Sequence, residues 1–168
     1  MYDVNTSDVR HFFAEVWQKR QQPHLLDALQ QKALRIIASH PEYEPYLAQV
    51  DAYLDHTWTP EQGETNPYLH LSLHLSIQEQ VAIDQPFGIA AIHKQLCSQY
   101  NDNWLKAEHL MMDALAETIW QAQRYGGGLD VNAYITRLRQ LIGLGQEDQI
   151  RLNPHEVNAE KTKNYSSE

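Results

Sequence analysis

Apolar residues recur every three or four positions in seven successive segments of the chain, which is the spacing of a helix with one buried face. Proline, glycine and asparagine separate these segments, and all three residue types are typical of helix ends and loops. No segment shows the strict alternation of apolar and polar residues that a half-buried strand requires. The sequence therefore predicts an all-α fold, a compact bundle of six to seven helices.

The capping residues set the expected helix boundaries. Ser7 is expected to cap the first helix, the pair Asn66-Pro67 to start a central one, and the glycines at 126–128 to end a long one. Residues 56–65 lack periodicity and are expected to form a loop anchored by Trp58. The expected helices span about 7–21, 26–39, 42–54, 66–84, 89–100, 103–124 and 130–142. We expect residues 1–142 to form a single helical domain and residues 143–168 to form a flexible polar tail.

Composition and charge narrow the classes of function. A content of 42% hydrophobic and 21% charged residues is typical of a folded domain, and the net charge is −9. This charge argues against phosphate-driven binding to nucleic acid and favours a protein partner with a basic surface. The single cysteine, Cys97, forms no disulfide within the chain, and neither a signal-peptide pattern nor a membrane-length apolar run is present. We therefore expect a cytoplasmic protein that does not enter membranes.

Three of the nine histidines suggest a metal site. His70 and His74 are four residues apart, so a helix places both rings on one face, where two imidazoles can reach one divalent ion. On the expected helix at 103–124, His109 faces inward and Asp113 follows one turn later. If these two helices pack together, the three histidines form a site with an open fourth position. Asp113 then serves as a ligand or as a hydrogen-bond acceptor for a ligand.

The identity of the ion stays open between zinc, which favours hydrolysis, and iron, which favours oxygen chemistry. In the competing interpretation, His70 and His74 bond to backbone carbonyls or nearby carboxylates and serve helix packing alone. The sequence gives no sign of a role for six further histidines, which lie singly near expected helix ends or polar faces. They are His11, His24, His40, His56, His93 and His155. Cys97 would be a nucleophile only if a histidine came near it.

Long motifs in the central segment carry a resemblance to a known family. They are NPYLHLSLHL at 66–75, EQ at 79–80 and IDQPFGI at 83–89. Supporting matches are Phe12-Phe13 with Trp17, HPEY at 40–43, and His109 with Met112, Glu117 and WQAQR at 120–124. Over about residues 4–142 the chain resembles the bacterial family of uncharacterised proteins known as domain of unknown function 1841. The family favours Glu where this chain has Asp113, and residues after Gly143 lie outside its usual extent. The resemblance implies no activity, but its richest stretches carry the candidate metal ligands.

The sequence thus supports hypotheses from different classes. The leading one is a non-enzymatic protein-interaction or regulatory module, because the chain is acidic and has no complete catalytic constellation. The alternative is a metal-binding bundle, a hydrolase or an oxygen-dependent enzyme, built on His70, His74 and His109. A third is a mimic of nucleic-acid charge, which acidic residues gathered on one face would favour. A homodimer through Tyr43, Tyr46 and Tyr53 is a further alternative.

Overall fold

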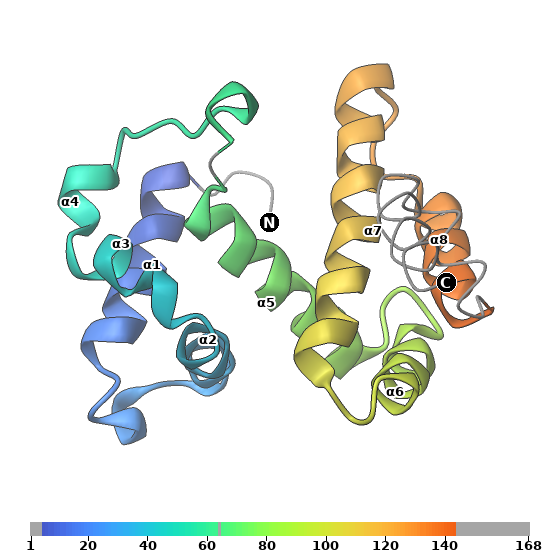
Figure 1. Cartoon of the computed structure of the whole chain (residues 1–168), viewed down its shortest axis with the longest axis horizontal. Helices are drawn as coiled ribbons and strands as arrows, with labels where there is room; N and C mark the ends of the chain where they lie inside the picture. The colour runs from blue at the N-terminus through green and yellow to red at the C-terminus, as the bar shows by residue number, and fades with distance from the viewer. Residues whose placement is uncertain (1–4, 64, 144–168) are drawn as a thin grey trace, which may run out of the picture. The chain divides into compact units, whose positions relative to one another are not determined.

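The computed structural model of the chain describes residues 5–63 and 65–143, and this part of the chain folds into α-helices joined by turns and short 3-10 helices (Figure 1). The expected all-α fold is confirmed. The helices divide into two compact units, Met1–Ile83 and Asp84–Glu168. The expected tail at 143–168 falls almost wholly outside the described residues, and the expectation of one domain over residues 1–142 stays a prediction. No helix in the described part is long and apolar enough to cross a bilayer.

The first unit is drawn from blue to green in Figure 1. Its helices are α1 (Thr6–Gln18), α2 (Ala28–Ala38), α3 (Glu44–Ala48), α4 (Val50–Tyr53) and α5 (Pro67–Ile83), with 3-10 helices at Pro23–Leu25, Pro41–Tyr43 and Pro60–Gln62. Helix α1 packs against α2, α3 and α5, and α2 packs against α5. The core between them is built mainly from fully buried aliphatic and aromatic side chains. They include Phe13, Val16, Ala33, Ile36, Leu47, Tyr68 and Leu71.

The second unit consists of α6 (Ile89–Gln99), α7 (Trp104–Tyr125) and α8 (Val131–Gly143), each packed against the other two. Met111 on α7 and Leu138 on α8 are fully buried, as are Ile89 and Leu96 on α6. At the junction of the two units, Asp84 adopts a left-handed conformation with φ 50°. Its side chain accepts hydrogen bonds from the backbone N–H groups of Gly88 and Ala90 and so supports the start of α6.

The helix ends confirm most of the capping predictions. The Asn66 side chain accepts from the Leu69 backbone N–H, Pro67 is the first residue of α5, and Gly126 follows the last residue of α7. The cap of α1 is a correction, because Asn5, and not Ser7, accepts the free backbone N–H there. The expected helix at 42–54 is also divided, since Gln49, with φ −122° and ψ 43°, leaves the helical region between α3 and α4.

Four aromatic side chains form a cluster within the first unit. The ring of Tyr46 contacts Tyr53 at 4.9 Å and Trp58 at 6.1 Å, and Trp58 contacts Tyr68 at 5.9 Å. The Tyr68 hydroxyl donates to the Tyr46 carbonyl at 2.6 Å. Trp58 thus anchors its loop as expected. The tyrosines of the expected dimer contact pack against their own unit, and the homodimer stays a prediction.

Tyr68 makes the stability of this cluster sensitive to alkaline pH. Burial raises the pKa of Tyr68 to about 12, an effect that nearby Arg10 opposes. Since the folded state holds the phenol proton more tightly than the unfolded chain, this stabilisation is complete below pH ~10. It is lost as the pH rises from there through about 12. We expect Tyr68→Phe to lower the free energy of unfolding by about 1 kcal/mol at pH 8, because the hydrogen bond to Tyr46 is lost.

Between pH 9 and 12 we also expect the free energy of unfolding of Tyr68→Phe to fall less steeply than that of the wild type. Urea unfolding across this range measures both effects. Tyr125→Phe, at a position that is 72% exposed, serves as the control and should keep the wild-type slope. Equal slopes for Tyr68→Phe and the wild type would contradict this assignment.

Candidate metal centre

His40 lies two residues after the end of α2, directly before the 3-10 helix that begins at Pro41. A residue before proline is disfavoured in the helical region, and His40 accordingly has φ −130° and ψ 62°. Its side chain is 3% exposed, and its Nδ1 lies 2.8 Å from the carbonyl oxygen of Ile36. A carbonyl accepts only, so Nδ1–H donates this bond and Nε2 carries a lone pair. The end of α2 thereby fixes both the orientation and the tautomer of the His40 ring.

Two further imidazoles come from the facing helix, α5. His70 and His74 are one turn apart on α5, and the packing of α2 against α5 brings both rings to His40. Ring centroids are 4.8 Å apart for His40 and His70 and 5.5 Å apart for His40 and His74. His74 is fully buried, whereas His70 is partly exposed, so solvent reaches the cluster on the His70 side.

The ring nitrogens of His40 and His70 are in hydrogen-bond contact. Their Nε2 atoms are 3.0 Å apart. Because the Ile36 carbonyl holds the proton of His40 on Nδ1, the Nε2 of His40 accepts this bond and the Nε2–H of His70 donates it. The proton between these nitrogens occupies the place that a metal ion would take, so a metal-bound neutral His70 would carry its proton on Nδ1 instead of Nε2.

One ring nitrogen from each of His40, His70 and His74 lies within 4.8 Å of the other two. Zinc–nitrogen bonds of about 2.0–2.1 Å in a tetrahedron place two ligand nitrogens roughly 3.4 Å apart. The 3.0 Å pair is close to this value, and no separation among the three exceeds 4.8 Å. The three rings thus form a nearly assembled set of donors.

Tyr43 forms one wall of this three-histidine cluster. Its ring stacks on His40 with centroids 5.4 Å apart and planes 5° apart, and it meets His70 edge-on at 5.6 Å. Burial, together with the negative charge of Glu42 and the neighbouring Tyr46, raises the pKa of the Tyr43 phenol. Tyr43 therefore keeps its proton at neutral pH and restrains the rings by packing, without adding a phenolate charge.

The donor set determines which ions suit the cluster. Neutral imidazole is a favourable ligand for zinc, copper, nickel and iron, whereas magnesium and calcium prefer oxygen. Three neutral ligands also leave the full double charge on the ion, so an anion or a hydroxide is favoured at any remaining position. A three-histidine set with such a position is the ligand pattern of catalytic rather than closed structural sites.

Two of the four predicted site residues thus meet as expected, because His70 and His74 share a face of α5 and converge in the first unit. His109 and Asp113 belong to α7 in the second unit, so their part in the site stays a prediction. The interpretation of His40 as an isolated histidine is corrected, since it contacts both rings. The only feature of the sequence that could have singled out His40 is its position between an amphipathic helix and a proline.

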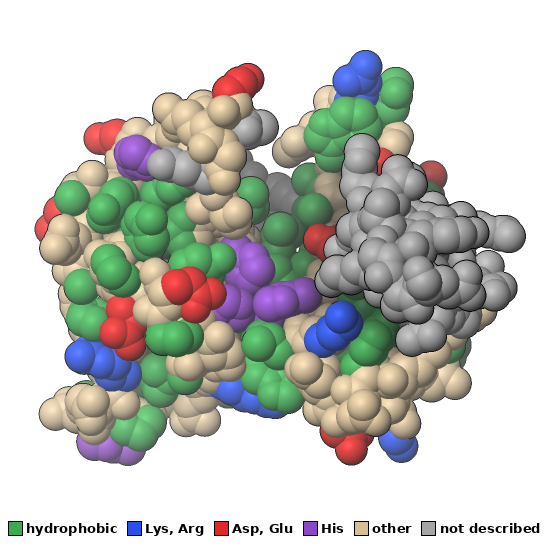
Figure 2. Space-filling view, in the orientation of Figure 1, with side chains coloured by type: hydrophobic (Ala, Val, Ile, Leu, Met, Phe, Trp, Pro, Cys, Tyr) green, Lys and Arg blue, Asp and Glu red, His purple; other side chains and the backbone are tan. Residues whose placement is uncertain are grey.

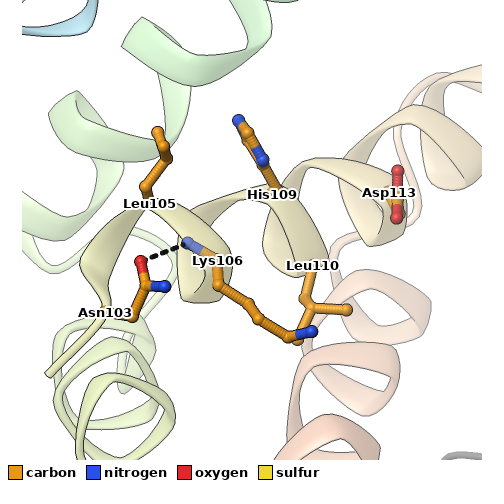
Figure 3. A pocket seen from close by; sticks show the side chains of 6 residues that line it. All are labelled: Asn103, Leu105, Lys106, His109, Leu110 and Asp113. Atoms are coloured by element: carbon orange, nitrogen blue, oxygen red, sulfur yellow. Dashed lines mark hydrogen bonds between the residues drawn. The ribbon is translucent and has the colours of Figure 1, made fainter. Parts of the chain in front are cut away.

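His109 and Asp113 line a pocket of about 310 Å³ on α7. Figure 3 shows Leu105 and His109 projecting from one side of the helix, with Asp113 a turn beyond His109 and Lys106 directed away from them. The Asn103 side chain accepts from the Lys106 backbone N–H and caps the start of α7 beneath this pocket. Desolvation raises the pKa of Asp113, although the side chain keeps an exposed surface. This carboxyl group therefore holds its proton to a higher pH than an ordinary aspartate does.

Comparison with known proteins identifies the family. The model of the family DUF1841, a domain of unknown function, matches residues 5–140. The chain belongs to this family. The match includes both units as far as α8, so the three-histidine cluster lies inside the DUF1841 region. Searches of curated proteins and of solved structures each found no match to the chain. Membership in DUF1841 brings no activity with it, and the function has to be argued from the site.

Proposed function

We propose that the chain binds one divalent transition-metal ion through His40, His70 and His74. The observation that carries the proposal is the convergence of three ring nitrogens within 4.8 Å, with His40 held in place by the Ile36 carbonyl. Ligating histidines commonly donate their second ring N–H to a backbone carbonyl, which fixes the ring and makes it a better donor. His40 has this arrangement before any ion is bound.

The architecture of the first unit supports the proposal. The ligands come from two elements, the end of α2 and the middle of α5, which pack against each other. The capping box of α2, formed by Asp27 and Gln30, and the Asn66 cap of α5 are within the same unit. An ion that bridges the two elements would bind the folded unit more tightly than the unfolded chain, so it would stabilise the fold.

The competing explanation is a structural one, in which the imidazoles only bond to one another and specify how α2 packs on α5. The two explanations differ in a measurable property, because only a metal centre binds an ion with one-to-one stoichiometry. Protein without an affinity tag is titrated with zinc and, separately, with cobalt. We expect one ion per chain and a rise in the melting temperature on binding. Absence of binding, or equal binding by a variant lacking His74, would exclude the metal centre.

A coordination position not filled by the protein would allow the bound ion to take part in catalysis. Zinc held by these three histidines would lower the pKa of bound water to about 7 and so supply hydroxide for hydrolysis, whereas iron would support reactions with oxygen. The site is nitrogen-rich and neutral, so the substrate class that it favours is anionic. This deepens the metal hypothesis drawn from the sequence, with His40 added to His70 and His74.

The interaction-module and charge-mimic hypotheses stay predictions. On the face drawn in Figure 2, acidic side chains are scattered among basic and apolar ones, so this face gives no support to mimicry of nucleic-acid charge. A partner with a basic surface, a cytoplasmic location and a homodimer are likewise expectations from the sequence. The metal proposal is the one that a specific geometry favours.

A further inference from the structure

A thiol, an imidazole and a carboxyl group meet in the second unit. His93 and Cys97 are one turn apart on α6, and Glu108 projects from α7, which packs against α6. The His93 Nε2 lies 3.0 Å from the Glu108 Oε1. The Cys97 sulfur lies 3.7 Å from Nε2 and 4.0 Å from Nδ1 of the same ring. Cys97 could act as a nucleophile only with a histidine nearby, and His93 meets this condition.

Glu108 is buried, whereas His93 and Cys97 are partly exposed, and this difference leaves the sulfur accessible for a reaction. Glu108 is 3% exposed, and a buried carboxylate is costly unless a donor meets it. The His93 side chain, by contrast, is 21% exposed, and Cys97 is partly exposed. The carboxyl group is thus held inside the unit, while the ring and the sulfur can meet a molecule from solvent.

The contacts of His93 indicate that a proton would move from the Cys97 thiol to the Nδ1 atom of the ring. Glu108 as a carboxylate accepts the bond from Nε2–H of His93, so Nδ1 is the ring nitrogen with a free lone pair. That nitrogen is 4.0 Å from the Cys97 sulfur, within the range of a weak S–H···N contact. Transfer of the thiol proton to Nδ1 produces a thiolate beside an imidazolium, and Glu108 stabilises the imidazolium charge.

We propose that Cys97 is a reactive thiol, activated by His93 and Glu108, and that it is a modification site for small disulfides. In the reaction the Cys97 thiolate attacks one sulfur of the disulfide, forming a new S–S bond as the original S–S bond breaks. The leaving thiolate takes the proton from the His93 imidazolium, and the disulfide is the oxidant that is reduced. The product is a mixed disulfide on Cys97. This chain has one cysteine, so an external thiol is needed to reverse the modification.

The aromatic disulfide 5,5′-dithiobis(2-nitrobenzoate) serves as the probe, and the rate of release of its coloured thiolate is measured at pH 6 and pH 8. An ordinary thiol with a pKa near ~8.5 is almost fully protonated at pH 6 and reacts slowly there. We expect the folded chain to react at least about 10-fold faster at pH 6 than the same chain unfolded in guanidinium, because activation needs the folded trio. Cys97→Ser should abolish the reaction.

Variants of His93 and Glu108 test whether these side chains activate the Cys97 thiol or only lie next to it. His93→Gln and Glu108→Gln should each lower the pH 6 rate by about 10-fold, while at pH 8 the loss should be smaller, since an unassisted thiol ionises more there. Lys94→Gln, at the exposed position next to His93, is the matched control and should retain the wild-type rate. Circular dichroism verifies that each variant is folded, and Glu108→Gln decides the result if His93→Gln does not fold.

Two results would overturn the proposal. One is a folded wild-type chain that reacts no faster at pH 6 than the unfolded chain, which would show a shielded or ordinary thiol. The other is an unchanged rate in a folded His93→Gln or Glu108→Gln variant, which would leave the His93–Glu108 pair with a packing role. These measurements need no added metal, so they are independent of the proposed function.

Discussion

Replacing His74 by alanine is expected to weaken zinc binding by about 100-fold or more. The loss of a hydrogen-bond partner of a metal-bound histidine already costs about 10- to 100-fold in metal affinity, and in the proposed centre His74 is itself a ligand. It is fully buried and contacts His40 with ring centroids 5.5 Å apart, so no water replaces it without rearrangement of the cluster. Titration calorimetry with tag-free protein measures the affinity. His24→Ala, at an exposed histidine, is the control and should bind zinc like the wild type.

A buried substitution can weaken binding simply by loosening the fold, so a second variant is needed. His70→Ala removes a proposed ligand that is only partly buried and should preserve the fold better than His74→Ala. We expect it to lose zinc affinity to a similar extent while the metal-free protein keeps a melting temperature close to that of the wild type. Wild-type affinity in both variants would show that the cluster serves packing and not metal binding.

Arg10→Ala is expected to cost about 3 kcal/mol in the free energy of unfolding, the largest stability effect that we predict. Arg10 is 5% exposed, and its Nη1 donates to the carbonyl oxygens of Tyr53, Leu54 and His56, with distances of 2.8 Å to Leu54 and 3.1 Å to His56. Tyr53 is the last residue of α4 and the other two follow it, and backbone acceptors at a helix end lack helical partners. Alanine leaves them without this donor inside the protein.

The guanidinium group also lies over two rings of the aromatic cluster, 5.1 Å from the centroid of Trp58 and 5.3 Å from that of Tyr68. Arg10→Met separates the two contributions, since it keeps much of the packing but removes the donors. We expect it to lose about 2 kcal/mol, less than alanine does. Arg20→Ala, at an exposed arginine of the same unit, should cost less than about 1 kcal/mol. Urea unfolding measures all three, and an Arg10→Ala cost as small as that of Arg20→Ala would contradict this role.

The fold was largely predictable because its signals are local. The spacing of apolar residues, the Asn66-Pro67 start and the glycines after Tyr125 place α5 and α7 within a few residues of their observed ends. The break between α3 and α4 was missed because neither proline nor glycine marks Gln49. The cap of α1 was predicted at Ser7 but lies at Asn5. Asparagine and serine are both good capping residues, so the sequence alone does not decide between these two positions.

The sequence predicted only those residues of the candidate site that lie close together along the chain. His70 and His74 are four residues apart on one helix, so helical geometry alone places them together. His40 is 30 residues from His70, and its arrival depends on how α2 packs on α5, which a periodic pattern does not specify. The same holds for His93 and Glu108, which are 15 residues apart on different helices.

X-ray absorption at the zinc edge of the loaded, tag-free protein identifies the atoms that bind the ion. We expect one zinc per chain, bound by at least three imidazole nitrogens at about 2.0–2.1 Å. Loss of this imidazole signal in the variant with both His70→Ala and His74→Ala would assign it to the cluster of the first unit. Coordination by oxygen atoms alone, or a protein that retains no zinc after buffer exchange, would contradict a metal centre built on His40, His70 and His74.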